Sequence, residues 1–154
     1  MCRYKQHGDL LSGRLLFELV WHQIAGMTFF EGDERVGALL AVPADRQRTR
    51  ARGFDPIHVW AKRLGVLTGL PLLKASRKEG LAPQKTLNRR ERQANMRDVF
   101  QLEGRAPERV LIFDDVATTG ATLESLAVTC FERGAEWVGA LAFARTPTKR
   151  ANGY

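Results

Sequence analysis

Cysteine is scarce in this chain, and its two cysteines are not arranged for metal binding. Cys2 and Cys130 lie far apart, and neither belongs to a CxxC pair or has a histidine at ligand spacing. This argues against a structural zinc site within the chain. Two isolated thiols also fit a reducing cytoplasm better than a disulfide scaffold, so we expect both to be free.

Long apolar runs are missing as well. The longest uncharged stretch, Leu19 to Phe30, has twelve residues and includes a histidine and a glutamine, whereas a membrane-spanning helix needs about twenty apolar residues. Asp9, Arg14 and Glu18 interrupt every candidate apolar core of a signal peptide. The sequence therefore predicts a cytoplasmic protein with no membrane insertion.

Two common nucleotide-binding motifs are absent. No Gly-rich loop ends in Gly-Lys-Ser or Gly-Lys-Thr, which excludes a Walker A loop, and the GxGxxG dinucleotide fingerprint is also missing. The composition is nevertheless that of a folded protein, because 44% of the 154 residues are hydrophobic and 27% are charged. We expect a single domain over residues 1–154, large enough to bury a core under a sheet of about five strands.

Helix and strand signals alternate along the chain. Apolar residues at helical spacing predict a helix over Asp9–Gly26, with a buried face made of Leu11, Leu15, Leu16, Leu19, Val20 and Ile24. We expect Phe17 and Trp21 to pack there as well. The other predicted elements are a strand over Gly37–Pro43, a helix over Pro56–Thr68, a short strand over Leu70–Lys74, a strand over Val110–Phe113, a helix over Ala121–Arg133 and a strand over Trp137–Ala144. This alternation implies an α/β fold with a mainly parallel central sheet flanked by helices.

The segment VLIFDDVATTGAT, from Val110 to Thr122, joins a buried strand to two acids, a small hydroxyl-rich loop and a helix start. Asp114 and Asp115 are expected at the carboxyl end of the strand, where they can accept hydrogen bonds from a vicinal diol or hold Mg²⁺ through water. The loop residues suit an anion, because small side chains let backbone amides approach it and the helix dipole points at it: Thr118, Thr119, Gly120, Ala121 and Thr122. The alternative is purely structural, with acids that end a strand and a threonine, Thr118 or Thr119, that caps the helix.

This segment resembles the phosphoribosyl pyrophosphate (PRPP) motif of the type I phosphoribosyltransferases. The resemblance implies that Asp114 and Asp115 hold the ribose 2- and 3-hydroxyls and that Thr118 to Thr122 hold the 5-phosphate. Many purine-type members carry an aspartate at the first loop position, near the base nitrogen, where this chain has Thr118. No catalytic acid or base is therefore assigned, and none of the histidines receives a role.

Three further stretches resemble the ComF family of competence-associated, phosphoribosyltransferase-like proteins. They are YKQHGD near the start, Val42 to Asp55 and Pro83 to Phe100; the matching residues are Tyr4, Lys5, Gly8, Asp9, Pro43, Arg52, Gly53, Phe54, Gln84, Leu87, Arg92, Asn95 and Phe100. ComF proteins usually begin with a zinc-ribbon-like segment, which this chain does not show. The resemblance implies a type I phosphoribosyltransferase-like fold with a small N-terminal hood segment at 1–31, a mobile basic loop and helix at 76–100, and a role in DNA uptake.

Basic residues exceed acidic ones by 24 to 17, and the formal net charge of +7 is concentrated in two clusters. The first comprises Arg46, Arg48, Arg50 and Arg52, and the second comprises Lys85, Arg89, Arg90, Arg92 and Arg97. In one reading Arg46, Arg48 and Arg52 bind pyrophosphate and the second cluster is a flexible hood that excludes water. In another the arginines neutralise nucleic-acid phosphates; in a third they are solvated surface. Only Phe54 and Phe100 lie beside the clusters, which is few for a base-stacking surface.

These observations favour a PRPP-binding, phosphoribosyltransferase-type protein that uses Mg²⁺, held through substrate and water with no direct protein ligand. The resemblance implies that the protein catalyses phosphoribosyl transfer. The residues alone do not decide whether it does, because no catalytic acid or base is assigned. A non-catalytic sensor of PRPP or a nucleotide in DNA uptake is one alternative, and a basic module that binds single-stranded DNA is the other. The acceptor is not encoded in any motif, and a homodimer is compatible with the resemblance.

Overall fold

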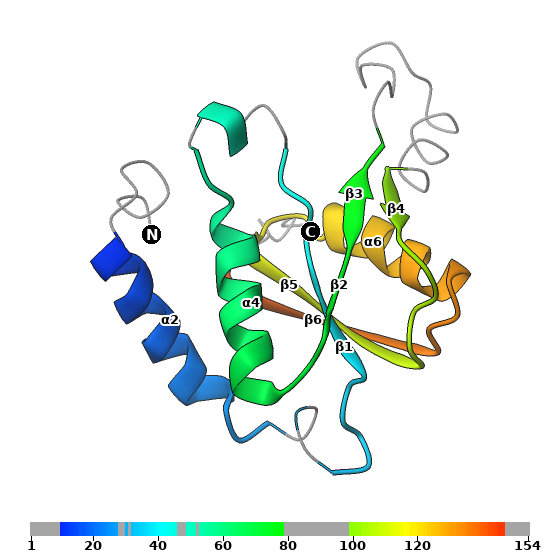
Figure 1. Cartoon of the computed structure of the whole chain (residues 1–154), viewed down its shortest axis with the longest axis horizontal. Helices are drawn as coiled ribbons and strands as arrows, with labels where there is room; N and C mark the ends of the chain where they lie inside the picture. Colours follow the sequence, from blue (N-terminus) through cyan, green and yellow to red (C-terminus); the bar gives the residue numbers. More distant parts are fainter. Residues whose placement is uncertain are drawn as a thin grey trace, which may run out of the picture.

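Strands and helices alternate along the described part of the chain, which in this computed structural model comprises residues 10–27, 30, 32–45, 49–51, 53–78 and 99–146. The elements follow in the order α2 (Leu10–Ile24), β1 (Ala38–Ala41), α4 (Pro56–Thr68), β2 (Leu72–Leu73), β3 (Ala75–Arg77), β4 (Phe100–Leu102), β5 (Arg109–Ala117), α6 (Ala121–Glu132) and β6 (Trp137–Arg145) (Figure 1). None of the described helices is long and apolar enough to cross a membrane.

The central sheet has four strands in the order β2-β1-β5-β6, and all of its strand pairs are parallel. The predicted α/β fold with a mainly parallel sheet and flanking helices is therefore confirmed. Within the described residues the sheet is one strand smaller than expected. In addition, β3 and β4 form a separate antiparallel pair that the sequence did not predict, because Ser76 and Arg77 had been expected at the start of an irregular stretch.

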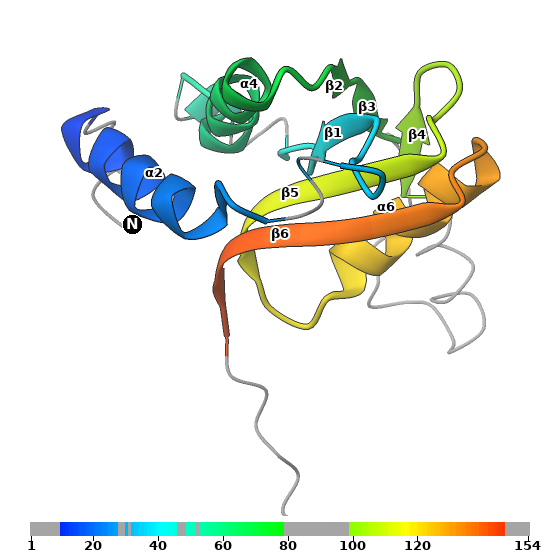
Figure 2. The same cartoon turned by 90° about the horizontal axis from the view of Figure 1, so that it is seen from below.

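The sheet is covered on both faces, because alternate strand residues point to opposite sides. One face carries Leu39, Leu111, Phe113, Leu141 and Phe143, and it packs against α2 and α4. The other carries Leu40, Val110, Ile112 and Val138, and it packs against α6 and β4. Figure 2 shows the two layers, with α2 and α4 on one side of β1, β5 and β6 and with α6 on the other.

Helix α2 confirms the predicted helix and most of its expected buried face. Ile24 and Phe17 are buried, and Leu16, Val20 and Trp21 pack against the core, whereas two expected residues point to solvent. Leu15 and Leu19 are 58% and 66% exposed, whereas Phe17 is 2% exposed and lies 6.4 Å from the ring of Phe143 in an edge-on contact. The aromatic side chains on the neighbouring stripe, Phe17 and Trp21, bury more apolar area per residue than leucine does, so the helix turns them inward. The Leu11 side chain lies outside the described part of the structure.

Strand boundaries follow the neighbouring strands more than the local sequence. Strand β5 runs four residues beyond the predicted end at Phe113, because β6 continues to pair with it as far as Arg145. By contrast, β1 and β2 are shorter than predicted; β2 has two residues and follows Pro71, which has no amide hydrogen to donate to a ladder.

Helix α4 has the predicted bounds, and both of its ends are fixed by local chemistry. The Asp55 carboxylate accepts hydrogen bonds from the amides of Ile57 (3.0 Å) and His58 (3.2 Å), and Pro56 occupies the first turn. Gly69 ends the helix with φ 68°, a left-handed conformation that favours glycine. These signals explain why the sequence located this helix correctly.

The cap makes a stability prediction. Replacing Asp55 by alanine leaves two first-turn amides of α4 without their acceptor, so we expect the free energy of unfolding to fall by about 1 kcal/mol. Asp55→Asn keeps an acceptor oxygen and should lose much less. Urea unfolding followed by circular dichroism measures both variants; equal stability of Asp55→Ala and the wild-type protein would contradict the assignment.

Candidate functional site

The sheet topology creates a crevice between β1 and β5. After β1 the chain turns into α4 on one face and returns to β2, whereas after β5 it turns into α6 on the other face and returns to β6. The two loops therefore diverge from the carboxyl ends of adjacent strands, which is where ligands bind in open α/β sheets. The starts of α4 and α6 both face this crevice.

Asp114 and Asp115 lie at this crevice, but within β5 and not after its end. Both residues belong to the ladder with β6, whereas β1 stops beside Phe113. The prediction that the two acids follow the end of their own strand is thus wrong. They do lie beyond the end of the neighbouring strand β1. Adjacent residues of a strand point to opposite faces of the sheet. Because β1 ends before these residues, no strand separates the two faces on that side, and both carboxylates can line one space.

That space is a cavity of about 400 Å³, which we call the acidic cavity. It is lined by three carboxylates, Asp45, Asp114 and Asp115, together with Thr122 from the first turn of α6 and Arg77 from β3. Asp115 is only 9% exposed, and its amide donates a hydrogen bond of 2.7 Å to Oδ1 of Asp114, which fixes the orientation of that carboxylate. Among the described residues, this lining contains three carboxylates and one guanidinium, although the whole chain is basic.

The predicted phosphate loop precedes α6 directly. Gly120 is the N-cap of the helix with φ 85°, a left-handed conformation, and within the described residues no side chain caps the helix. Thr119 accepts a 3.4 Å hydrogen bond from the amide of Ala121. The N-cap position is thus Gly120 and not Thr118 or Thr119, although the Thr119 hydroxyl still contacts the first amide of the helix. Of the five predicted residues, Thr122 lines the acidic cavity; Thr118 and Thr119 are exposed beside it.

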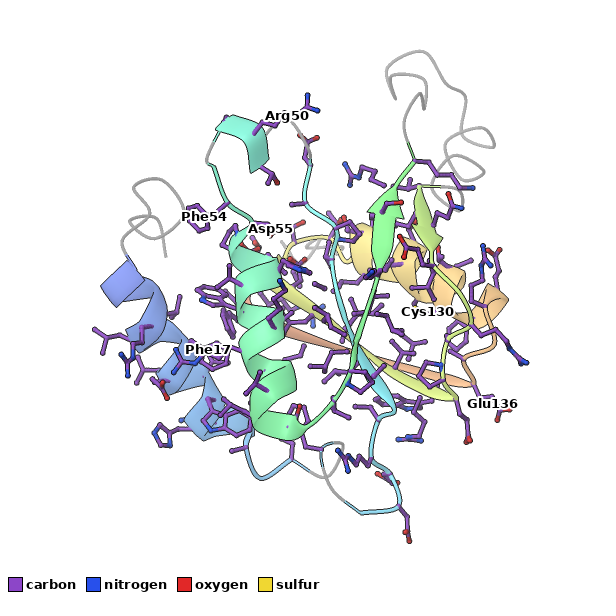
Figure 3. All side chains as sticks on the ribbon, viewed as in Figure 1. Phe17, Arg50, Phe54, Asp55, Cys130 and Glu136 are labelled. Atoms are coloured by element: carbon purple, nitrogen blue, oxygen red, sulfur yellow. The ribbon has the colours of Figure 1, made fainter. Side chains whose placement is uncertain are left out.

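A second cavity of about 550 Å³, the outer cavity, adjoins the acidic cavity and shares the segment that follows β1 with it. Its charged and titratable lining residues are Arg50, Asp55, His58, Lys74, Arg77 and Glu103. Figure 3 shows Arg50 on the loop above the start of α4, with Asp55 at the first turn below it. The described lining of this cavity has three cationic side chains and two carboxylates, so it is more basic than the described lining of the acidic cavity.

The basic residues proposed for pyrophosphate binding fall mostly outside the described structure. Arg46, Arg48 and Arg52 are not among the described residues, and neither is the second basic cluster. Their neighbours Thr49 and Arg50 are described, in a short helical turn in which the Thr49 amide donates to the carbonyl of Asp45 (2.9 Å). The loop that carries the predicted residues therefore borders both cavities.

Sequence reasoning missed Arg77, the only cationic residue among the described ones that lines both cavities. Strand β3 positions it through antiparallel pairing with β4, and its guanidinium lies 5.5 Å from the centre of the Phe100 ring. A signal was present, because Phe100 and Leu102 alternate with Gln101 in the pattern of a half-buried strand. That pattern required a partner strand, and the residues at 75–77 supply it.

Two other kinds of site find no support among the described residues. No group of three or more histidine, cysteine, aspartate or glutamate side chains lies close enough there to hold a metal ion by itself. Cys130 is fully buried on the α6 face, and burial raises the pKa of its thiol to about 11. At neutral pH this thiol is protonated and inaccessible, so it is neither a nucleophile nor a metal ligand.

The parallel sheet, with its crevice at the β1–β5 switch point, belongs to an open α/β fold of the phosphoribosyltransferase type. The fold is similar to that of orotate phosphoribosyltransferase from Aeropyrum pernix, with a TM-score of 0.54, 19% identity, and coverage of 90% of this chain and 73% of that chain. It is also similar to purine phosphoribosyltransferase from Pyrococcus horikoshii Ot3, with a TM-score of 0.52, 21% identity, and coverage of 88% and 73%.

A third similar structure is adenine phosphoribosyltransferase from Saccharomyces cerevisiae in complex with D-2,5-dideoxy-2,5-imino-altritol 1,6-bisphosphate and adenine. It has a TM-score of 0.51, 11% identity, and coverage of 93% of this chain and 72% of that chain. No protein-family model and no curated protein matches the sequence. At these identities the likeness establishes the type I phosphoribosyltransferase fold and nothing finer.

The Cys130 thiol predicts a pH dependence. Its pKa is about 11 in the folded protein and 9.0 in the unfolded reference, so the folded state binds more protons between these values and the free energy of unfolding falls as pH rises. Cys130→Ala removes this contribution; it lowers stability at neutral pH through a small cavity but should show a shallower decline in this pH window. Urea unfolding at a series of pH values compares the slopes, and equal slopes would refute the prediction.

Proposed function

We propose that the crevice binds PRPP and that the protein acts as a phosphoribosyltransferase-type protein. The observation that carries the proposal is the convergence of Asp114, Asp115 and Thr122 on one cavity, at the switch point of a phosphoribosyltransferase-type fold. These are residues that the sequence motif assigns to the ribose and to its 5-phosphate. Two carboxylates side by side suit a vicinal diol, because each can accept a hydrogen bond from one hydroxyl.

The 5-phosphate is assigned to the loop from Thr118 to Thr122. Its amides lie at the start of α6, where the helix dipole favours an anion. A β-carbon built at Gly120 would meet nothing closer than the Glu124 side chain at 3.9 Å, so the glycine is required for its positive φ and not for space. The exposed hydroxyls of Thr118 and Thr119 add hydrogen-bond donors to the same turn.

The pyrophosphate is assigned to the cationic side chains around the outer cavity. Arg50, Lys74 and Arg77 line it, and Arg46, Arg48 and Arg52 belong to the same loop as Arg50. Guanidinium groups hold phosphate oxygens in bidentate geometry, which suits a group with several negative charges. A PRPP molecule would thus span both cavities, with the diol at the carboxylates and the pyrophosphate at the cations.

Magnesium fits the acidic cavity as a partner of the substrate. The donors there are carboxylate oxygens of Asp45, Asp114 and Asp115, which is the hard oxygen chemistry that Mg²⁺ prefers, usually with several waters retained. Held there, the ion would neutralise charge on the pyrophosphate leaving group. Asp114 and Asp115 would hold it through water and through the ribose hydroxyls that they orient.

In an enzymatic reaction, a nitrogen atom of the acceptor bonds to C1 of the ribose while the bond from C1 to the pyrophosphate oxygen breaks. The residues named here act by positioning and by charge stabilisation, so no protein nucleophile is needed. A segment that excludes water protects the oxocarbenium-like centre from hydrolysis. We assign this cover to residues 76–100 and the acceptor contact to the N-terminal hood at 1–31, within a single cytoplasmic domain.

The residue at position 118 favours a second candidate function, in which the same site binds PRPP without catalysing a reaction. Thr118 stands where many purine-type phosphoribosyltransferases carry an aspartate near the base nitrogen, and ComF-like residues at 42–55 and 83–100 point to DNA uptake. The second candidate is therefore a PRPP sensor in competence. Incubation with PRPP, Mg²⁺ and a panel of bases decides between them: pyrophosphate release that depends on an acceptor supports the enzyme, and binding without release supports the sensor.

The net charge of +7 favours a third candidate, a module that binds single-stranded DNA. Counterion release makes such binding fall steeply with salt, and it would be insensitive to added PRPP because no specific cavity is involved. Measuring the affinity for an oligonucleotide in a salt series, with and without PRPP, separates this candidate from the other two.

The ribose assignment is tested with the double variant Asp114→Asn, Asp115→Asn. We expect loss of measurable PRPP binding in calorimetry, because neutral amides neither attract Mg²⁺ nor accept as strongly from hydroxyls. A matched control is Asp33→Asn with Glu34→Gln, which neutralises two adjacent exposed acids before β1, away from the cavity linings. Unchanged binding by the Asp114 and Asp115 variant, with an intact circular dichroism spectrum, would refute the assignment.

The role of Arg77 is tested by Arg77→Ala. A hydrogen bond to a charged group contributes about 1.5–3 kcal/mol, so the affinity for PRPP should fall by about tenfold to a hundredfold. Ribose 5-phosphate lacks the pyrophosphate, and its affinity should change much less. Lys78→Ala is the matched control, because Lys78 is the neighbouring cation and does not line either cavity. An equal loss of affinity for PRPP and for ribose 5-phosphate would show that Arg77 does not contact the pyrophosphate.

A further inference from the structure

Helix α2 carries apolar side chains on two opposite sides. Phe17 and Ile24 are buried in the core, whereas Leu15 and Leu19 are each more than half exposed. Both leucines are two residues away from Phe17, which corresponds to about 200° around an α-helix, so they point almost directly away from the core. On a surface helix this side is normally polar. An apolar outward side therefore indicates a further apolar contact of the helix.

Helix α4 shows the same arrangement next to α2. Ile57, Ala61 and Leu64 are buried, and two residues away from them Val59 and Val66 are 48% and 83% exposed. The valines therefore also point away from the core. Single exposed apolar residues are common and need no explanation. Here they occur in pairs on two neighbouring helices that cover the same face of the sheet (Figure 2).

An ion pair between the two helices shows how the exposed residues are arranged. Arg63 of α4 forms an ion pair with Glu18 of α2, and its guanidinium lies 4.7 Å from the centre of the Phe17 ring. Figure 3 shows Phe17 on the side of α2 that faces α4. Glu18 follows the buried Phe17 and Arg63 precedes the buried Leu64, so the pair lies about a quarter turn from the core side of each helix. The exposed leucines and valines lie further round and form an apolar strip on either side of the pair. We call this surface the α2–α4 face, and its apolar residues are Leu15, Leu19, Val59 and Val66.

The charge around the α2–α4 face is positive. Glu18 is the only acidic residue in the sequences of α2 and α4, and Arg63 neutralises it. Arg14 and Lys62 are further cations of these helices, and both are exposed. The face therefore combines aliphatic side chains with an excess of positive charge, and it belongs to a chain whose formal net charge is +7.

We propose that the α2–α4 face binds reversibly to the surface of an anionic phospholipid membrane. At such a surface, aliphatic side chains enter the boundary between headgroups and acyl chains, while lysine and arginine stay at the level of the anionic headgroups. The face supplies both kinds of contact on adjacent helices. None of the described helices is long and apolar enough to cross a membrane, so the contact is confined to the surface.

The shape of the face favours a lipid surface over an acidic helix of a partner protein. A partner helix of that kind lays its apolar anchors into a hydrophobic groove. On the α2–α4 face, the ion pair of Glu18 and Arg63 lies between the two apolar strips, where the floor of such a groove would be. The aliphatic side chains on either side project outward. Projecting side chains suit a fluid phase that closes around each of them.

The two kinds of contact give the association a recognisable salt dependence. Cations are attracted by the negative surface potential of the membrane, which salt screens over a Debye length of about 10 Å at 0.1 M. The apolar contacts are not screened, so part of the binding remains at high salt. Binding to nucleic acid would instead fall steeply with salt and would not depend on the exposed leucines.

This inference does not rest on the proposed function. Leu15, Leu19, Val59 and Val66 line neither the acidic cavity nor the outer cavity. PRPP should therefore leave the affinity for a membrane unchanged. A chain that binds no PRPP but binds vesicles would contradict the proposed function alone, and the reverse result would contradict this inference alone.

Co-sedimentation of the full chain with lipid vesicles tests the inference. We expect binding to vesicles of phosphatidylcholine in which about one third of the lipid is phosphatidylserine, because these carry a negative surface potential. Binding to vesicles of phosphatidylcholine alone should be about tenfold weaker or more, since only the apolar contacts remain.

The apolar contribution is tested by Leu15→Gln with Leu19→Gln. Glutamine has nearly the helix propensity of leucine, so α2 should persist, but two aliphatic side chains no longer leave water on binding. We expect the affinity for the anionic vesicles to fall about tenfold or more. The matched control is Phe131→Gln, which removes an exposed apolar side chain from α6 on the other side of the sheet and should bind like the wild-type protein.

The contribution of charge is tested by Arg14→Gln with Lys62→Gln. This variant should bind the anionic vesicles about tenfold more weakly at low salt, and the difference should shrink as salt increases. The matched control, Arg105→Gln with Arg133→Gln, removes the same charge at two exposed positions outside the face and should lose much less.

The orientation of the protein on the vesicle has its own readout. In a Cys2→Ser background, a polarity-sensitive fluorophore attached to Gln23→Cys lies one helical turn after Leu19 and should shift its emission to shorter wavelength on anionic vesicles. Cys130 is buried and does not react with the label. The same fluorophore on Glu132→Cys, at the end of α6, should not shift.

Three results would overturn the inference. The first is no binding to the anionic vesicles. The second is binding that the leucine variant leaves unchanged, because simple adsorption of a basic protein behaves in this way. The third is a chain that does not bind vesicles but forms a dimer, or a complex with an acidic protein, that the leucine variant dissociates; in that case a protein surface covers this face.

Discussion

The candidate site depends on the unequal lengths of the strands that flank β5. On one side β1 ends beside Phe113, and on the other side β6 continues to pair with β5 as far as Ala117. The ladder with β6 therefore holds the backbone of Asp114 and Asp115 in extended conformation, while the absence of β1 beyond Phe113 opens the space that both carboxylates line. A longer β1 would close the crevice, and a shorter β6 would leave the acids on an unsupported loop. The same ladder also makes β6 a long edge strand.

Local signals in the sequence were sufficient to predict the ends of those helices whose capping residues lie next to them in the chain. The ends of α4 follow from Asp55, Pro56 and Gly69, and the start of α6 follows from the turn at Gly120. The motif from Val110 to Thr122 also contains the two acids and the threonine that line the acidic cavity, because its order of strand, acids and loop suits a switch-point crevice. Parallel pairing followed from the alternation of strands and helices.

The remaining features are set by residues that are distant in the sequence. The end of β5 depends on β6, more than twenty residues away, and the pairing of β3 with β4 depends on segments on either side of 79–98. Leu15 and Leu19 have the spacing of a buried face but are exposed, because the packing of Phe17 against Phe143 sets how far α2 is rotated about its axis. Arg77 was missed for the same reason, because its place between the cavities is created by a strand pair and not by a motif.

Among the described residues, the charges of the two cavity linings are unevenly distributed, which favours the proposed small ligand over a nucleic-acid backbone. A surface built to hold a nucleic-acid backbone would be expected to keep carboxylates away from the contact, yet the acidic cavity holds Asp45, Asp114 and Asp115 in a chain of net charge +7. The cations Arg50 and Lys74 lie on the outer side, and Arg77 stands at the junction. Such polarity suits a small ligand with hydroxyls at one end and phosphates at the other, held across the junction, better than a polymer of uniform charge.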